Sequence, residues 1–266
     1  MKGFILAFRS EFYKSRKTLG FWASVLLPLL INSLIFAGFY SRSATLASMP
    51  PMVLWLQFAG AILGIMGSLL LPMYIIFIAY SVNSVEHKAD TWKTLFTLPI
   101  ARWYVYAAKY VYAIFLVFVC LALFVLFTIG FGDLLSVVKP ELRFDNFHME
   151  KELVQIYFKL FLSASGILAI QFLLSLLWSD FLKPMGIGFV CTIAGVILAS
   201  KGWEYAYAFP YSHPMVAITT MMRRDKANPA NQLAIDIFTK DVFVSLAVAV
   251  VVFVAGYFIV QRKSVK

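Results

Sequence analysis

Charged residues are scarce in this sequence. Only 14% of its 266 residues are Asp, Glu, Lys or Arg, whereas an ordinary soluble domain has about 25%. Apolar residues make up 62% of the chain, and the mean hydropathy is +0.84. Both departures indicate lipid as the solvent. The hydrophobic runs leave no stretch long enough for a separate soluble domain, so we expect one membrane domain over residues 1–266.

Cysteine and the common site motifs are also scarce. The two cysteines, Cys120 and Cys191, each lie inside an apolar run, which predicts two buried thiols rather than a disulfide framework or a metal site. No G-x-x-x-x-G-K-[ST] phosphate loop is present, so this chain does not bind ATP by that route. We expect no cofactor, no metal and no catalytic residue on this chain.

Six apolar runs are long enough to cross a bilayer, which takes about 20 residues because the hydrocarbon core is ~30 Å thick. The sequence therefore predicts an all-α, polytopic integral membrane protein with six transmembrane helices. The runs are roughly Phe21–Tyr40, Leu54–Val82, Tyr110–Phe131, Ile156–Trp178, Pro184–Ser200 and Val242–Val260.

Ionisable residues are expected to lie outside the cores of these spans, with Lys159 counted among the residues beyond the membrane. Proton relays and ion-coupled carriers usually need ionisable groups at membrane depth, so this expectation disfavours both classes. Asn32, Gln57 and Gln171 carry amides in or near the spans. Hydrogen bonding between helices is the predicted role of these amides.

The distribution of charge predicts the orientation. With the first end in the cytoplasm, the inner segments hold thirteen basic and four acidic residues, a net charge of +9. The outer segments then hold ten basic and nine acidic residues, a net charge of +1. Basic residues resist translocation, so both termini are predicted to be cytoplasmic. This placement favours a membrane surface, and not nucleic acid, as the partner of the basic charge.

Residues 1–20 are predicted to form an interfacial helix. Phe4, Ile5, Phe8 and Phe12 fall on one face at 100° per residue, and five basic residues occupy the rest. Such a basic amphipathic helix is expected to lie along the cytoplasmic membrane surface before the chain enters the bilayer.

The segment 83–107, between the second and third runs, has the signals of a short cytoplasmic helix. Asp90 or Thr91 is suited to cap this helix, and Pro99 is suited to end it. One face of the helix would carry Trp92, Leu95 and Phe96.

The same segment resembles the permease family of type-2 ABC transporters. Those permeases carry a Glu, a short gap, a Thr, a Leu-rich turn, Leu-Pro and Arg, then a Lys that begins the next span. The matching residues here are Glu86, Thr91, Leu95, Thr97, Leu98, Pro99, Ile100, Arg102 and Lys109. A glycine often precedes the Thr in the family, whereas this chain has Asp90. The aromatic-proline segment Phe209–Pro214 is similar to one in the bacteriocin-immunity branch.

The resemblance implies a mechanism as well as a fold. A separate ATP-binding ABC subunit would dock on the cytoplasmic segment, and a second permease copy or paralogue would complete a dimer in the plasma membrane. The outer loop, residues 201–241, would be partly inserted into the lipid. The expected function is export of antimicrobial peptides or other amphipathic compounds. The residues expected to couple to the ATPase are Glu86, Lys88, Asp90, Thr91, Trp92, Leu95, Phe96, Pro99 and Arg102.

Two glycines fit a small-residue helix contact. Gly60 and Gly64 are four residues apart in the second run, the spacing that lets two helix backbones approach closely.

Two other classes of function stay open on the sequence. The first is a membrane scaffold that binds partners and moves no substrate. The second is an integral membrane enzyme that acts through its outer loops, for which the candidate residues are His148, Glu150, Glu152 and His213.

Overall fold

The computed structural model describes residues 2–89, 101–221 and 235–262. Within these ranges the chain is helical, and it contains no strand. Six helices are long and apolar enough to span a membrane, each at one of the six predicted runs. The all-α prediction with six transmembrane helices is therefore confirmed.

The first half of the chain is a short helix followed by two spans. Helix α1 is followed by α2, the short α3, α4 and α5, and a π-helical turn joins the last two. Together, α4, the π-helical turn and α5 form one span of 37 residues, Pro51–His87. The bounds are α1 Lys2–Ser15, α2 Leu19–Ser41, α3 Ser43–Leu46, α4 Pro51–Ile65, the π turn Met66–Leu70 and α5 Leu71–Ala89.

The second half contributes four spans and a short outer helix. Single turns of 3-10 helix precede α8 and α10. The bounds are α7 Arg102–Val138, the turns Pro140–Leu142 and Phe144–Asn146, α8 Glu150–Leu177, α9 Leu182–Ser200, the turns Ala206–Ala208 and Pro210–Ser212, α10 His213–Met221 and α11 Lys240–Arg262.

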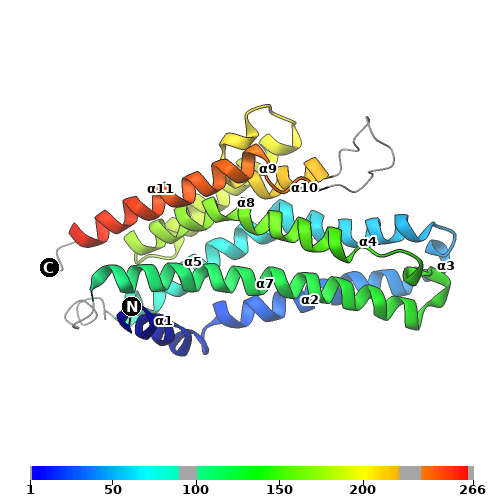
Figure 1. Ribbon diagram of the computed structural model, residues 1–266, viewed down its shortest axis with the longest axis horizontal. Coiled ribbons are helices and arrows are strands. Elements are labelled where there is room, and N and C mark those ends of the chain that lie inside the picture. The colour runs from blue at the N-terminus through cyan, green and yellow to red at the C-terminus, as the bar shows by residue number, and fades with distance from the viewer. Residues whose placement is uncertain (1, 90–100, 222–234, 263–266) are drawn as a thin grey trace.

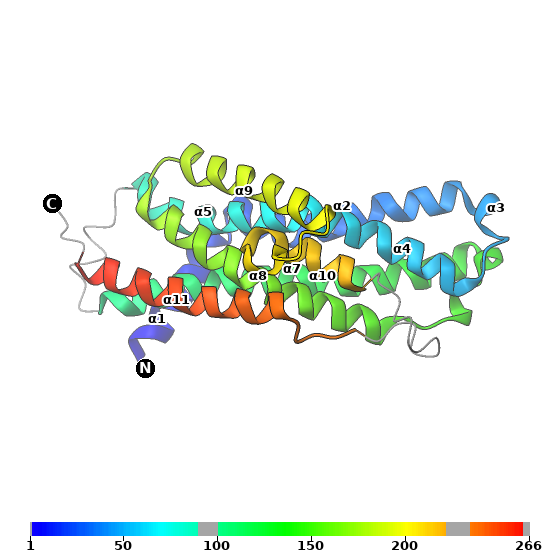
Figure 2. The ribbon, with the colours of Figure 1, turned by 90° about the horizontal axis from the view of Figure 1, so that it is seen from above.

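The spans pack into an elongated bundle with both chain ends at the same end (Figures 1 and 2). The first described residues, the end of α5, the start of α7 and the end of α11 all gather there. Helix α8 is central, since α5, α7 and α11 all pack against it. An even number of crossings places both ends on one side of a membrane, as the charge distribution requires. That this side is the cytoplasm stays a prediction.

Much of the outer surface of the bundle is apolar. On α2, Leu26, Leu30 and Leu34 are each more than half exposed. Their exposure suits contact with lipid. The span at Arg102–Val138 has 37 residues and is about 55 Å long, so its ends extend beyond a ~30 Å hydrocarbon core.

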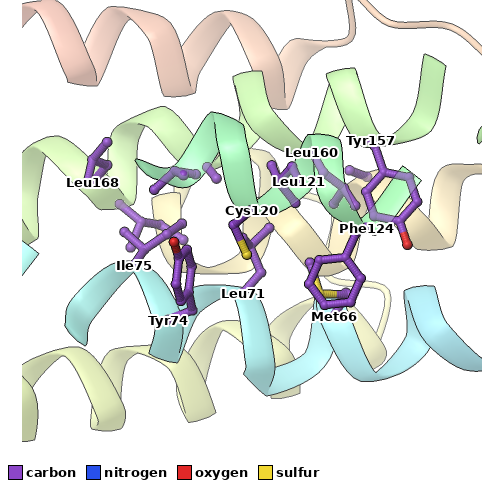
Figure 3. Packing of buried hydrophobic residues seen from close by; sticks show 14 of the residues in the cluster. Met66, Leu71, Tyr74, Ile75, Cys120, Leu121, Phe124, Tyr157, Leu160 and Leu168 are labelled. Atoms are coloured by element: carbon purple, nitrogen blue, oxygen red, sulfur yellow. The ribbon is translucent and has the colours of Figure 1, made fainter. Parts of the chain in front are cut away.

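The interior is packed with large side chains from α5, α7 and α8 (Figure 3). Cys120 lies among Tyr74, Leu71 and Phe124 and is fully buried. Cys191 is half-buried, and both cysteines are free thiols, as predicted. The Tyr74 hydroxyl donates to the Leu116 carbonyl oxygen at 3.1 Å, which fixes α5 against α7.

Two of the three predicted amides tie elements together. The Thr128 hydroxyl on α7 donates to the Asn32 Oδ1 on α2 at 3.1 Å. Gln171 Nε2 donates to the Tyr211 hydroxyl at 2.6 Å, which holds an outer turn against α8. Gln57 is exposed, and its amide reaches only the Met49 sulfur, at 3.5 Å.

The expectation that span cores carry no ionisable residue is wrong. Lys159 lies ten residues into α8, inside the fourth predicted run, and only 2% of it is exposed. Its Nζ donates to the Thr220 hydroxyl of α10 at 3.2 Å. Lys159 stands near the start of its run. The sequence pattern therefore did not show whether it belongs to the span or to the loop before it. The folding of α10 back onto α8 encloses it.

Gly60 and Gly64 do not form a helix contact within the described chain. A Cβ added at either position would meet no atom within 4 Å, so these glycines make no close helix contact inside this bundle. One close approach to backbone lies at Gly195 on α9, where an added Cβ would stand 2.5 Å from the Tyr211 carbonyl oxygen. A contact of Gly60 and Gly64 with a second copy stays a prediction.

The two kinds of glycine should respond oppositely to alanine. We expect Gly195→Ala to destabilise the protein by about 1–3 kcal/mol because it overpacks α9 against the Tyr211 backbone. The matched change Gly60→Ala should be neutral or stabilising by up to about 1 kcal/mol because it removes a helix-interior glycine. Thermal unfolding of both variants in one detergent measures the difference. Equal unfolding temperatures would contradict the packing of the outer turn on α9.

Candidate functional site

Four charged side chains from three helices meet inside the bundle, at the end where the chain termini lie. Glu11 and Lys14 come from α1, Glu86 comes from α5, and Lys109 comes from α7. We refer to these four residues as the charge cluster. Its two carboxylates and two ammonium groups balance in charge, so the cluster is neutral as a whole.

Lys109 is the centre of the charge cluster. Its Nζ lies 2.5 Å from Glu86 Oε2 and 2.9 Å from Glu11 Oε2. It also donates to the Val82 carbonyl oxygen at 3.0 Å. All three hydrogens of this ammonium group therefore have an acceptor, which is the condition for burying a lysine in its charged form.

Lys14 contacts the second oxygen of each carboxylate in the cluster. Its Nζ lies 3.0 Å from Glu86 Oε1 and 3.2 Å from Glu11 Oε1. Partial burial favours the neutral amine, but the carboxylates of Glu11 and Glu86 outweigh it and raise the pKa of Lys14 above its ordinary value. Lys14 is consequently cationic at neutral pH.

Burial makes this cluster different from a surface ion pair. Glu86 and Lys109 are at most 1% exposed, and Glu11 is 5% exposed. Charges removed from water strongly require one another, because loss of one leaves its partner buried without compensation. The cluster therefore constrains the relative positions of α1, α5 and α7.

The sequence of α1 explains how it reaches α7. Glu11, Lys14 and Ser15 lie within about one turn of the helix, so they share the face turned toward the bundle. On the same side, the rings of Phe8 and Phe12 pack edge-on against Tyr112 of α7. The Ser15 hydroxyl donates to the Tyr112 hydroxyl. The charge cluster is thus flanked by aromatic and polar contacts between the same two helices.

The end of α5 also contacts α8, through residues that do not belong to the charge cluster. Asn83 Nδ2 donates to the Ser175 hydroxyl of α8 at 2.8 Å. A ring nitrogen of His87 lies 3.1 Å from the Ser175 carbonyl oxygen. Glu86 therefore sits on a helix end that contacts α1 and α7 through charges and α8 through hydrogen bonds.

The predicted coupling residues are only partly within the described ranges. Glu86 turns into the bundle, away from the surface, and Arg102 is the first residue of α7. Lys88 lies in the last turn of α5. The others, Asp90, Thr91, Trp92, Leu95, Phe96 and Pro99, fall in residues 90–100, outside the described residues. That segment connects the α5 end to the α7 start, so both of its anchoring helices contribute to the charge cluster.

Sequence reasoning did not assemble the cluster. It placed Glu11 and Lys14 on an interfacial helix and treated Lys109 only as part of a motif. One signal was present: Lys109 follows Ala107 and Ala108 and precedes Tyr110, a lysine in an otherwise apolar segment. An isolated charge of this kind needs an acidic partner. The α1 helix exists as expected, but its position in a membrane surface stays a prediction.

Among the residues proposed for an enzyme, one contact is seen in the described ranges, and it joins two exposed side chains that are close in sequence. His148 and Glu150 form an exposed pair, with the ring nitrogen Nδ1 3.2 Å from Oε1. His213 is fully buried, where one ring nitrogen contacts the Tyr207 carbonyl oxygen at 2.8 Å and burial lowers its pKa. Within the described ranges, no group of three or more His, Cys, Asp or Glu residues is arranged to hold a metal.

The comparisons with known proteins give one match. The family model described as "ABC-2 family transporter protein" matches residues 7–195, which include the whole charge cluster. Neither the search of curated proteins nor the search of solved structures gave a significant match.

Removal of the central cation should be costly. We expect Lys109→Met to destabilise the protein by about 3–5 kcal/mol, because it leaves two buried carboxylates with only Lys14. The control is Lys139→Met, which breaks a partly exposed pair with Glu141 at 3.6 Å and a contact with the Tyr40 ring, and should have a much smaller effect. Unfolding in detergent at neutral pH measures both. If the two variants unfold alike, the charge cluster does not hold the bundle together.

Proposed function

The chain belongs to the ABC-2 family of transporter proteins, whose members are membrane permeases of ABC transporters, and from this premise we propose that it exports amphipathic compounds with energy from a separate ATP-binding subunit. The permease is not itself the enzyme. ATP hydrolysis would take place on the partner, in agreement with the lack of a phosphate loop in this sequence.

The charge cluster is the observation that carries this proposal. Residues 90–100 run between α5 and α7, and Glu86 and Lys109 link those two helices to each other and to α1. A force applied to this segment by a docked ATPase would reach three helices together. Paired buried charges resist separation, so the helix ends would move as one body.

The proposed docking surface follows the sequence pattern. Trp92, Leu95 and Phe96 would insert into an apolar groove on the ATP-binding subunit, and Lys88, Asp90, Lys93 and Arg102 would set the register. Thr91 and Pro99 would bound the helix that carries them. Glu86 has a different role in this account: from inside the bundle, it would connect the docking segment to α1 and α7.

A complete exporter needs more than one copy of the permease. We propose that a second copy or a paralogue pairs with this chain in the plasma membrane, with all termini in the cytoplasm. The mostly apolar spans favour an amphipathic or lipid-like substrate that travels beside or between them. Antimicrobial peptides belong to this class, which would give the bacteriocin-immunity role suggested by Phe209–Pro214.

The first test is what the protein assembles with. We expect the tagged chain, purified in mild detergent from its native membrane, to bring down a stoichiometric subunit with a phosphate-binding loop and ATPase activity. Recovery of the chain without an ATPase, under conditions that preserve other ABC complexes, would favour the scaffold alternative.

The same complex tests the coupling role. In liposomes, the Glu86→Gln complex is compared per folded complex, because the change also weakens the buried cluster; it should still hydrolyse ATP but lower transport per ATP by about tenfold, a typical size for a coupling between sites. Glu141→Gln removes a carboxylate at the opposite end of the bundle and should leave the ratio unchanged. An unchanged ratio in Glu86→Gln would remove the charge cluster from the coupling mechanism.

A further inference from the structure

A large open-sided cavity lies beside the charge cluster, on the other side of α5. Its volume is about 820 Å³. Lys17 and Leu19 line it from the junction of α1 and α2, and Ser81 and Ser84 line it from α5. Phe181, just before α9, closes it from a third direction. Three parts of the chain that are distant in sequence therefore form one site, to which no role has been given so far.

The polar part of this cavity is suited to an anion. Lys17 is exposed and is the one charged residue among those that line the cavity. Within the described residues, no carboxylate forms an ion pair with it. The Ser81 and Ser84 side chains stand on the same stretch of α5. The Ser84 hydroxyl donates to the Ser81 carbonyl oxygen at 3.0 Å, so an anion would be held mainly by the Lys17 ammonium group, a common partner of phosphate and carboxylate.

The remainder of the cavity is suited to a hydrocarbon chain. Phe77 and Val85 line it from α5, and the rings of Tyr80 and Phe181 meet edge to face with centroids 4.8 Å apart. From Val85 to Phe77 the helix covers about 12 Å along its axis, leading from the end of the span toward its interior. Phe77, the deepest of the lining residues on α5, is apolar, so the inner end of the site suits the chain of an amphiphile.

We propose that this cavity binds an anionic amphiphile from the membrane leaflet on the α1 side, with its head group beside Lys17 and its chain against Phe77 and Phe181. The membrane is the source, because Leu19 at the rim begins a span and is 77% exposed. A water-soluble anion would make no use of the aromatic wall. That the bound amphiphile is also the transported compound rests on the proposed function.

The position of the cavity gives binding a consequence. Ser84 and Val85 immediately precede Glu86, and Lys17 lies three residues after Lys14. An amphiphile in this site would contact α5 and the junction of α1 and α2, next to the residues of α1 and α5 that the charge cluster joins. A bound amphiphile would therefore contact the chain directly beside the helix ends that are proposed to receive force from the ATPase.

The test uses the purified full-length chain in lipid nanodiscs. Phosphatidic acid with a photoreactive acyl chain should label the peptides that contain Phe77–Val85 and Lys17–Leu19, whereas a phosphatidylcholine probe with the same chain should label them weakly. Lys17→Gln should lower labelling by the anionic probe about fivefold, the effect of one basic residue near a charged membrane surface. Val85→Phe, which fills the cavity, should lower it as well.

Two neighbouring substitutions serve as controls. Arg16→Gln removes an equal charge one residue away, from a side chain that does not line the cavity, and should change labelling less than twofold. Leu26→Phe adds the same kind of bulk on the exposed face of α2 and should have no effect.

Three results would overturn the proposal. Equal labelling by the two probes would exclude selection of an anionic head group. Equal losses in Arg16→Gln and Lys17→Gln would show a diffuse surface charge instead of a site. Displacement of the probe by soluble glycerol phosphate would show that the membrane is not the source. Because no ATP-binding subunit is present, these outcomes are independent of whether the chain is an exporter.

Discussion

The arrangement of this membrane bundle depends on four charges that cannot be separated without a large cost. Glu11, Glu86 and Lys109 bring two carboxylates and one ammonium group into the interior, and the partly exposed Lys14 adds the second ammonium group from the edge. Lipid supplies no attraction between apolar helices, so contacts of this kind have unusual influence on how spans associate. The result is a neutral junction that fixes α1 to the ends of α5 and α7. The segment proposed to dock an ATPase starts and ends at this junction.

Helix α5 connects the functional features of the molecule. One of its faces contributes Glu86 to the charge cluster, and another lines the cavity through Phe77, Ser81 and Ser84. In the middle of the same span, a π-helical turn at Met66–Leu70 interrupts the regular helix where Gly67 meets Ile218 of α10. Such turns often mark functional positions in helices. A displacement of the α5 end by ATP would thus be felt at the charge cluster and at the cavity together.

The sequence predicted the fold well because each span is a local property. Twenty apolar residues in a row require a helix in lipid, whatever the rest of the chain does. Pairing of side chains is not local, and most errors arose there. Lys159 was placed outside the membrane because nothing nearby in sequence shows that α10 covers it. Gly60 and Gly64 have the spacing of a helix contact, but which face of α4 meets a neighbour depends on the whole bundle. Glu86 was identified from a family motif, whereas its partner on α1, Lys14, is 72 residues away in the sequence.

The central claim is that the charge cluster keeps α1 and α7 together while ATP is used. Spin labels at Tyr13 and Trp103, both exposed, report the separation of these helices by double electron–electron resonance in a background without Cys120 and Cys191. The labelled chain would be measured in complex with its ATP-binding subunit, with and without trapped nucleotide. The account predicts the same distance distribution in both states, and a nucleotide-dependent shift only when Lys109 is replaced by Met. A shift in the protein with the intact cluster would contradict it.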